Sequence, residues 1–169
     1  MAGLGYAGIQ KKKAAEAASA KATAEADDSN TVTWQGKTYK YNQNLSNYLL
    51  LGVYKRTPAE TRVGKADAGQ ADALFLLSLN RKTKEMTMIS IPRDTMTDVE
   101  SFDLEGKSLG KSKDHISLSY GYGDGGAESC KLTQEAVSNL FYGLPIQGYL
   151  AMNLDGIPEL TKSVGGLTV

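Results

Sequence analysis

The sequence predicts an α/β fold built on a mixed β-sheet flanked by helices. From Tyr48 onward, short apolar runs of strand length are separated by turn residues. In the second half of the chain these runs alternate with segments whose apolar residues recur at helical spacing. Alternating strands and helices are typical of α/β proteins, and a hairpin among the strands makes the expected sheet mixed.

Residues 1–46 differ from the rest of the chain in composition. They are low in large apolar side chains, and residues 11–28 contain eight alanines, mainly among lysines, glutamates and serines. Such a segment has little to bury, so we expect a linker or stalk, with a packed helix as the alternative. Residues 1–10 are apolar but shorter than the roughly 20 residues that a membrane helix needs.

Three strands are expected in the first half of the domain. The run Tyr48–Tyr54 (YLLLGVY) is typical of a strand buried on both faces. Asp72–Asn80 (DALFLLSLN) has the same character, and the polar stretch 80–84 predicts a turn into a returning strand over Glu85–Ile91. Pro92 ends that strand because it has no N–H to donate to a neighbour.

The second half predicts two further strands and two helices. A strand over His115–Tyr120 is expected to lead through a glycine-rich turn into a helix over Ala127–Tyr142. A strand over Gln147–Asn153 and a short helix over Gly156–Val164 follow, and glycines just beyond each helix are typical C-terminal caps. Residues 167–169 have the character of another strand that is just beginning. The apolar face expected for the longer helix comprises Leu132, Ala136, Val137, Leu140 and Phe141.

Charge and cysteine content exclude several functional classes. The 19 basic and 19 acidic residues give a formal net charge of zero, so the chain lacks the field that draws a protein onto nucleic acid. With one cysteine, Cys130, and one histidine, His115, it can form neither an intrachain disulfide nor a multi-histidine zinc site. Any metal site would have to use carboxylate oxygens, which favours a hard ion such as magnesium.

The first candidate site is Ser90–Thr95 (SIPRDT), where an expected strand ends in a proline turn. Arg93 at such a position can fork onto two phosphate oxygens, and Asp94 beside it can orient the guanidinium or hold a cation. The alternative is an arginine–aspartate pair on the surface, which contributes little energy.

Asp72 is the second candidate. Counted from a turn centred on Lys82, Asp72 and Arg93 lie ten and eleven residues away, so both are expected at the same end of the hairpin. A carboxylate there could ligate magnesium beside a phosphate held by Arg93. The alternative is an ordinary polar strand end.

The third candidate is the glycine-rich turn Gly121–Gly126 (GYGDGG), which contains G-x-G-x-x-G between an expected strand and a helix. A dinucleotide site is not expected, because no acidic residue ends a strand about 20 residues further on. A pyrophosphate or carbohydrate near the turn, or a plain flexible turn, remain as interpretations.

Four blocks of sequence carry a resemblance to a known family. They are NYLLLGVYKR, GQADALFLLSLNRKTKEMTMISIPRDT, HISLSYGYGDGGAES and YLAMNLDGIPELTKSVGGLTV. In order and spacing they resemble the LytR-CpsA-Psr (LCP) family of bacterial cell-envelope proteins. The resemblance covers residues 47–169 as the N-terminal part of that family's catalytic domain, which implies a fold truncated on its C-terminal side. Residues 34–44 (WQGKTYKYNQN) are similar to the lead-in of clostridial-type members.

The resemblance implies a function in the cell envelope. Members of this family, earlier described as transcriptional attenuators, transfer teichoic acid or capsular polysaccharide from undecaprenyl pyrophosphate to peptidoglycan, with magnesium. They are typically held by one membrane helix with the domain outside the cell, as in Gram-positive bacteria. We therefore expect an extracytoplasmic parent protein, anchored by a helix not present in this chain, with polyprenyl-linked glycopolymer and peptidoglycan as partners and no nucleic acid.

The resemblance also assigns roles to individual residues. Arg93 corresponds to the arginine that contacts pyrophosphate, and Arg93 with Asp94 are the catalytic candidates. Asp72 corresponds to an aspartate that helps to bind magnesium. Gln70 and His115 occupy positions where the family has arginine and often lysine, so they join Arg93 as substrate-binding candidates.

The departures from the family pattern weaken the expected site. Tyr54 stands where the family has a second aspartate for magnesium, Gln70 and His115 replace cationic side chains, and the family's later arginine cluster lies beyond Val169. Because these changes reduce the positive charge available to pyrophosphate, we expect the chain as given to be inactive or nearly so.

Two hypotheses follow. In the first, the chain is a truncated form of a phosphotransferase. In the second, it belongs to a degenerate branch that binds polyprenyl-linked glycopolymer or cell wall without catalysis. A fold lacking its later strands is also expected to expose sheet edges and to associate.

Overall fold

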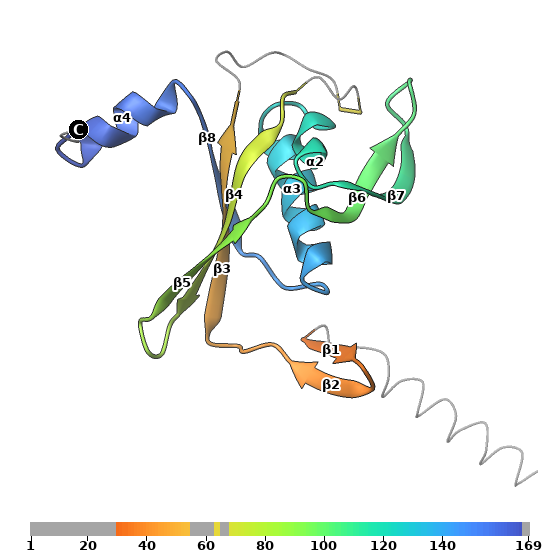
Figure 1. The fold of residues 1–169 in the computed structure, drawn as a ribbon, viewed down its shortest axis with the longest axis vertical. Helices are drawn as coiled ribbons and strands as arrows, with labels where there is room; N and C mark the ends of the chain where they lie inside the picture. The colour runs from red at the N-terminus through yellow and green to blue at the C-terminus, as the bar shows by residue number, and fades with distance from the viewer. Residues whose placement is uncertain (1–29, 55–62, 65–67, 167–169) are drawn as a thin grey trace, which may run out of the picture. The chain divides into compact units, whose positions relative to one another are not determined.

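The computed structural model describes residues 30–54, 63–64 and 68–166. The chain divides into two compact units, Met1–Tyr41 and Asn42–Val169. Figure 1 shows the elements of each unit along the chain. The second unit carries every residue of the candidate site that the sequence analysis names.

The described part of the first unit is a hairpin within the segment expected to be a linker. Strands β1 (Thr31–Trp34) and β2 (Lys37–Lys40) pair antiparallel, with Trp34 opposite Lys37. Gln35 and Gly36 between them have positive φ angles of 48° and 74°, the combination found in two-residue type I′ turns. The expected strand-like segment at 167–169 lies outside the described residues.

The second unit is built on a four-stranded mixed sheet with the order β5-β4-β3-β8. Strand β3 (Leu45–Val53) pairs antiparallel with β4 (Ala71–Asn80), which pairs antiparallel with β5 (Met86–Ile91). Strand β8 (Gly148–Asn153) lies parallel to β3 on its other side. The predicted α/β class with a mixed sheet is confirmed, and so is the predicted β4–β5 hairpin.

Polar contacts place β8 beside β3. The Asn47 side chain, buried at the start of β3, donates to the carbonyl of Pro145 (2.9 Å) and accepts a hydrogen bond from Ser78 (2.6 Å). The backbone N–H of Gln147 donates to the Asn47 carbonyl at 2.8 Å. These bonds satisfy a buried amide and fix the register in which Gly52 lies opposite Met152.

The expected strand over His115–Tyr120 is wrong. A second hairpin, β6 (Met96–Phe102) and β7 (Ser108–His115), precedes it, and the short helix α2 (Leu118–Gly121) occupies its place. The β7 sequence SLGKSKDH is polar and mostly exposed, so it lacks the apolar alternation that marks a strand. The hydroxyl of Ser119 donates to the Ile116 carbonyl at 2.6 Å, a local bond that favours a helical turn over an extended chain.

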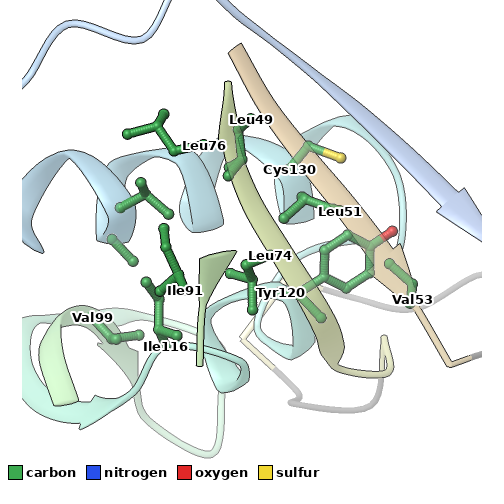
Figure 2. Close-up of a cluster of buried hydrophobic side chains, with 13 residues drawn as sticks. Leu49, Leu51, Val53, Leu74, Leu76, Ile91, Val99, Ile116, Tyr120 and Cys130 are labelled. Atoms are coloured by element: carbon green, nitrogen blue, oxygen red, sulfur yellow. The ribbon is translucent and has the colours of Figure 1, made fainter. Parts of the chain in front are cut away.

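The core lies between the sheet and helix α3 (Ala127–Leu140). Figure 2 shows leucines of β3 and β4 directed toward Cys130, Tyr120 and Ile116. Two residues of the apolar face predicted for α3, Ala136 and Val137, are buried. The other buried residues of α3 are Ser129, Cys130 and Thr133, which were not predicted to lie on that face. Helix α3 ends two residues before the predicted Tyr142. The predicted cap at Gly143 is confirmed, because Gly143 has a φ of 88° and its N–H donates to the Ser138 carbonyl at 2.8 Å.

Both outer strands of the sheet carry exposed side chains. Residues 86–90 of β5 are all exposed, and so are Tyr149 and Leu150 of β8. Helix α4 (Gly156–Ser163) buries none of its residues. Among residues 30–54, 63–64 and 68–166, no helix is both long and apolar enough to cross a membrane.

Candidate functional site

The hairpin register brings Asp72 and Arg93 together. Leu74 of β4 pairs with Ile91 of β5, so Asp72, two residues before Leu74, faces Arg93, two residues after Ile91. Pro92 ends β5 at this point and leaves Arg93 in the turn beyond the sheet. The sequence-based expectation that the two residues share one end of the hairpin is confirmed.

Arg93 is held by two side chains on one edge of its guanidinium. Nη1 forms an ion pair with Oδ1 of Asp72, and Nη2 donates to Oε1 of Gln70 at 2.6 Å. Nε lies 3.7 Å from the carboxylate of Asp94. The side chain of Arg93 is 44% exposed, so the charged group remains at the surface.

His115 joins the same cluster through Asp94. Its Nδ1 lies 3.2 Å from the backbone carbonyl oxygen of Asp94 and 3.7 Å from the Asp94 carboxylate. The backbone of this region is fixed because Ile116 N–H donates to the Thr95 carbonyl at 2.9 Å. The structure therefore places Gln70, Asp72, Arg93, Asp94 and His115, all of the predicted site residues, in one connected set of polar contacts.

An apolar groove adjoins the cluster at Asp72. Its volume is about 200 Å³, and β3, β4, β8 and the start of α4 line it. Tyr54 also lines the groove and is 73% exposed. No local pattern in the sequence marks this groove, because it depends on the parallel pairing of β3 with β8, whose paired residues, such as Tyr48 and Gly148, are 100 positions apart. The groove is lined by Gly52, Val53, Tyr54, Asp72, Ala73, Met152, Asn153, Leu154 and Ile157.

The donor atoms at Asp72 are compatible with a magnesium ion, but only in an open site. The described part of the chain contains no group of three or more histidine, cysteine, aspartate or glutamate side chains that could hold a metal. Magnesium often takes only one or two carboxylates and completes its shell with water and substrate phosphate. Asp72 provides one such carboxylate, 31% exposed at the rim of the groove, and Tyr54 lines the same groove.

The backbone N–H groups of the glycine-rich turn are bonded to a side chain of the turn itself. Oδ1 of Asp124 accepts hydrogen bonds from the backbone N–H groups of Gly126 (2.7 Å), Glu128 (3.1 Å) and Ser129 (3.3 Å) at the start of α3. Burial raises the pKa of Asp124, but these hydrogen bonds outweigh it and lower the pKa below its ordinary value. Because the chain's own carboxylate occupies the donors that an anion would need, the structure favours a turn without a bound phosphate, and a carbohydrate near the turn stays a prediction.

A protein-family model shows which family the chain belongs to. Residues 6–169 match the model of the LytR_cpsA_psr family. The chain belongs to the LytR-CpsA-Psr family. The resemblance read from its four sequence blocks is thereby confirmed.

Curated members of the LytR-CpsA-Psr family give the same result. The chain is 32% identical over 129 residues to a polyisoprenyl-teichoic acid–peptidoglycan teichoic acid transferase TagU of Bacillus licheniformis, covering 76% of this chain and 35% of that protein. It is 34% identical over 124 residues to the protein of the same name from Oceanobacillus iheyensis, covering 73% and 33%. The chain thus spans about a third of the length of these curated relatives.

Solved structures of similar proteins support the fold. Bacillus subtilis TagV aligns with a TM-score of 0.50 and 29% identity, covering 74% of this chain and 42% of TagV. Protein gbs0355 of Streptococcus agalactiae aligns with a TM-score of 0.53 and 26% identity, covering 75% and 39%. The α/β fold is therefore shared with these proteins.

Proposed function

We propose that this chain forms part of a cell-envelope phosphotransferase that moves a glycopolymer, such as teichoic acid or capsular polysaccharide, from undecaprenyl pyrophosphate to peptidoglycan. The observation that carries the proposal is an exposed arginine, Arg93, held by Gln70 and Asp72 at the rim of an apolar groove. A polyprenyl pyrophosphate has a charged head and an apolar tail, which suit these two adjoining surfaces. The names of the TagU relatives support the same reaction class.

Arg93 would act on the phosphates of the donor. Its planar guanidinium can fork onto two phosphate oxygens and stabilise the charge that develops on the departing polyprenyl phosphate. Asp94, 3.7 Å from Nε, helps to orient the guanidinium. His115 contacts Asp94 from the end of β7 and offers a further polar side chain to the head group.

Magnesium would be held at this site by Asp72. When bound, the ion would neutralise charge on the pyrophosphate. The position of Asp72 between the arginine and the apolar groove supports this assignment, because the head group would lie at the same place.

We also propose an extracytoplasmic setting. The parent protein would be anchored in the cell membrane by a helix outside this chain, and peptidoglycan would be the acceptor. The formal net charge of zero is consistent with a local anion site and gives no support for a nucleic-acid partner.

A transfer assay tests the phosphotransferase proposal. The complete protein that contains this chain is incubated with magnesium, a labelled polyprenyl-pyrophosphate-linked saccharide and peptidoglycan, and label in the insoluble wall is measured. We expect transfer that Arg93→Ala lowers by about 10²- to 10³-fold, because the main charge-stabilising donor is lost. Arg93→Lys keeps the charge without the planar fork, so its rate of transfer should lie between the rates of the wild type and Arg93→Ala. Absence of transfer, while a control transferase works, would reject the proposal.

The second candidate function is binding without catalysis. The specific observation that favours it is Tyr54, an exposed phenol at the groove where the family has a carboxylate, together with the uncharged Gln70. In that case undecaprenyl phosphate should raise the melting temperature of the protein although no transfer occurs. The double variant Tyr54→Asp/Gln70→Arg separates the two: a gain of transfer shows that these two side chains had suppressed catalysis.

A further inference from the structure

The chain's own side chains occupy the edge of Arg93 that is suited to a phosphate. A phosphate binds an arginine most strongly when two parallel N–H groups reach two of its oxygens. In this structure Nη1 is paired with the Asp72 carboxylate and Nη2 with the Gln70 amide oxygen. Among the residues that the structure describes, Asp72 is the carboxylate within hydrogen-bonding distance of this guanidinium.

We propose that Asp72 is a built-in competitor for the anion at Arg93, so that a phosphate binds Arg93 by displacing Asp72. The proposal rests on the proposed function, since it takes Arg93 as the phosphate-binding group. It goes beyond that function by naming a residue that sets the affinity: Asp72 weakens the binding of pyrophosphate to Arg93. Substitution of Asp72 should therefore tighten binding of a metal-free anion.

The exposure of the pair makes this exchange feasible. The side chains of Arg93 and Asp72 are 44% and 31% exposed, so water can reach both groups after they separate. Ion pairs at such positions stabilise proteins weakly. Pyrophosphate carries more charge than one carboxylate and can make the same two-oxygen contact, so it can take the place of Asp72.

Asp98 provides a matched control for Asp72. Its carboxylate also forms an exposed ion pair, but with Lys113 at 3.0 Å, and its side chain is 46% exposed. Asp98→Asn therefore removes the same charge and a comparable ion pair, without removing any side chain of the cluster at Arg93. A general effect of net charge would appear in both variants, whereas competition for Arg93 would appear mainly in one.

Calorimetric titration with inorganic pyrophosphate in buffer that contains a chelator tests the proposal on the 169-residue chain. We expect Asp72→Asn to bind about five- to tenfold more tightly than the wild type, because it loses both a competing ion pair and a repelling charge. Asp98→Asn should change affinity by no more than about twofold, since its carboxylate pairs with Lys113 and not with Arg93. Arg93→Ala should abolish binding.

The possible results separate this proposal from the proposed function. Binding that Arg93→Ala abolishes but Asp72→Asn leaves unchanged or weakens overturns the competition and leaves the function standing. Equal tightening by the two aspartate variants also overturns it, in favour of a general charge effect. Binding that survives Arg93→Ala overturns both proposals. No binding by any of the proteins overturns the competition alone, because the proposed function uses magnesium and this titration excludes it. Binding by Asp72→Asn alone supports the competition.

A measurement without ligand keeps the test valid if Asp72→Asn lowers stability. Phenylglyoxal modifies accessible arginines, and peptide mass mapping gives the rate for each one. Arg93 should be modified faster in Asp72→Asn than in the wild type, because the ion pair no longer covers Nη1. Arg81, whose Nη2 donates to the Gln43 carbonyl, is the internal reference for general loosening of the fold. Equal acceleration at both arginines would contradict the proposal.

Discussion

Two turns of this protein have the residues to receive a phosphate, one after β5 and one before α3, and their chemistry differs. At the first, Arg93 is partly exposed and its partners are side chains that can exchange with an anion. At the second, three backbone N–H groups converge on one oxygen of the chain's own Asp124.

The comparison shows which property makes a turn a binding site. A glycine-rich turn before a helix offers N–H groups to an anion only while no nearby side chain accepts them. Asp124 lies within the turn and reaches its donors without any movement of the chain, whereas Asp72 reaches Arg93 from a neighbouring strand. The first contact is local and structural, while the second can be broken without disturbing the sheet.

The largest effect on stability is expected from a substitution at Gly123 in the turn before α3, called the closed turn because its Asp124 accepts hydrogen bonds from the N–H groups at the start of α3. A Cβ atom added there would lie 2.2 Å from the backbone nitrogen of Ser129, far inside van der Waals contact. Gly123→Ala should therefore lower the free energy of unfolding by about 3 kcal/mol, measured by urea denaturation.

Gly126→Ala is the control in the same turn. Its Cβ would meet only the Asp124 carboxylate at 3.5 Å, so the expected loss is under about 1 kcal/mol. Similar losses in the two variants would show that the turn is not packed as described. Pyrophosphate binding at Arg93 should be unchanged in Gly126→Ala, because the two turns are chemically separate.

The thiol directly behind the closed turn should be nearly inert. Cys130 is buried at the start of α3, and burial, followed by the nearby charge of Asp124, raises its pKa from 9.0 to about 11. Below pH 9.0 the thiolate fraction is then about 100-fold lower than for an ordinary cysteine, and alkylation in the native state should be slowed at least as much.

An exposed thiol on the same helix calibrates this measurement. Lys131→Cys places a cysteine next to Cys130, at a position where the native side chain is 62% exposed. Iodoacetamide should label residue 131 rapidly and Cys130 only after denaturation. Equal labelling rates in the native protein would mean that the turn opens readily, and the contrast with the Arg93 turn would then be lost.

The β4–β5 hairpin and its charged end could be predicted from the sequence because both depend on local signals. An apolar run, a polar turn and a returning strand fix which residues face each other, so counting from Lys82 was enough to bring Asp72 to Arg93. The β7 strand could not be predicted in this way. Its polar residues pair with β6 at the surface, and no apolar pattern records that pairing.

The groove beside Asp72 was beyond sequence reasoning for a different reason. It forms where Val53 and Asn153 end two parallel strands, and no local pattern specifies that β8 joins β3. His115 shows an intermediate case. Its place in the cluster was expected from the family resemblance, although it reaches Asp94 from the end of a strand and not from the start of one.

The smallest expected effect concerns the charge of Asp124. Its pKa is below the ordinary value of 3.8 in the folded protein, because backbone N–H groups stabilise the ionised form. A lowered folded-state pKa means that Asp124 contributes stability above pH 3.8, and that this contribution is lost as the pH falls through the lower folded value. Asp124→Asn should therefore lower the free energy of unfolding by roughly 0.5–1 kcal/mol near neutral pH, since the carboxylate is largely exposed.

The free energies of unfolding of the wild type and Asp124→Asn should differ by an amount that depends on pH, and this dependence distinguishes a helix cap from a surface charge. Urea denaturation of the wild type and Asp124→Asn should give curves that converge as the pH drops below 3.8, because the wild-type carboxylate becomes protonated. Asp155→Asn, at the start of α4, is the matched control, since the Asp155 side chain makes no capping hydrogen bond. Asp155→Asn should leave the free energy of unfolding nearly unchanged at every pH. If the two variants behave alike, Asp124 does not occupy the donors of α3, and the turn before α3 would again be open to an anion.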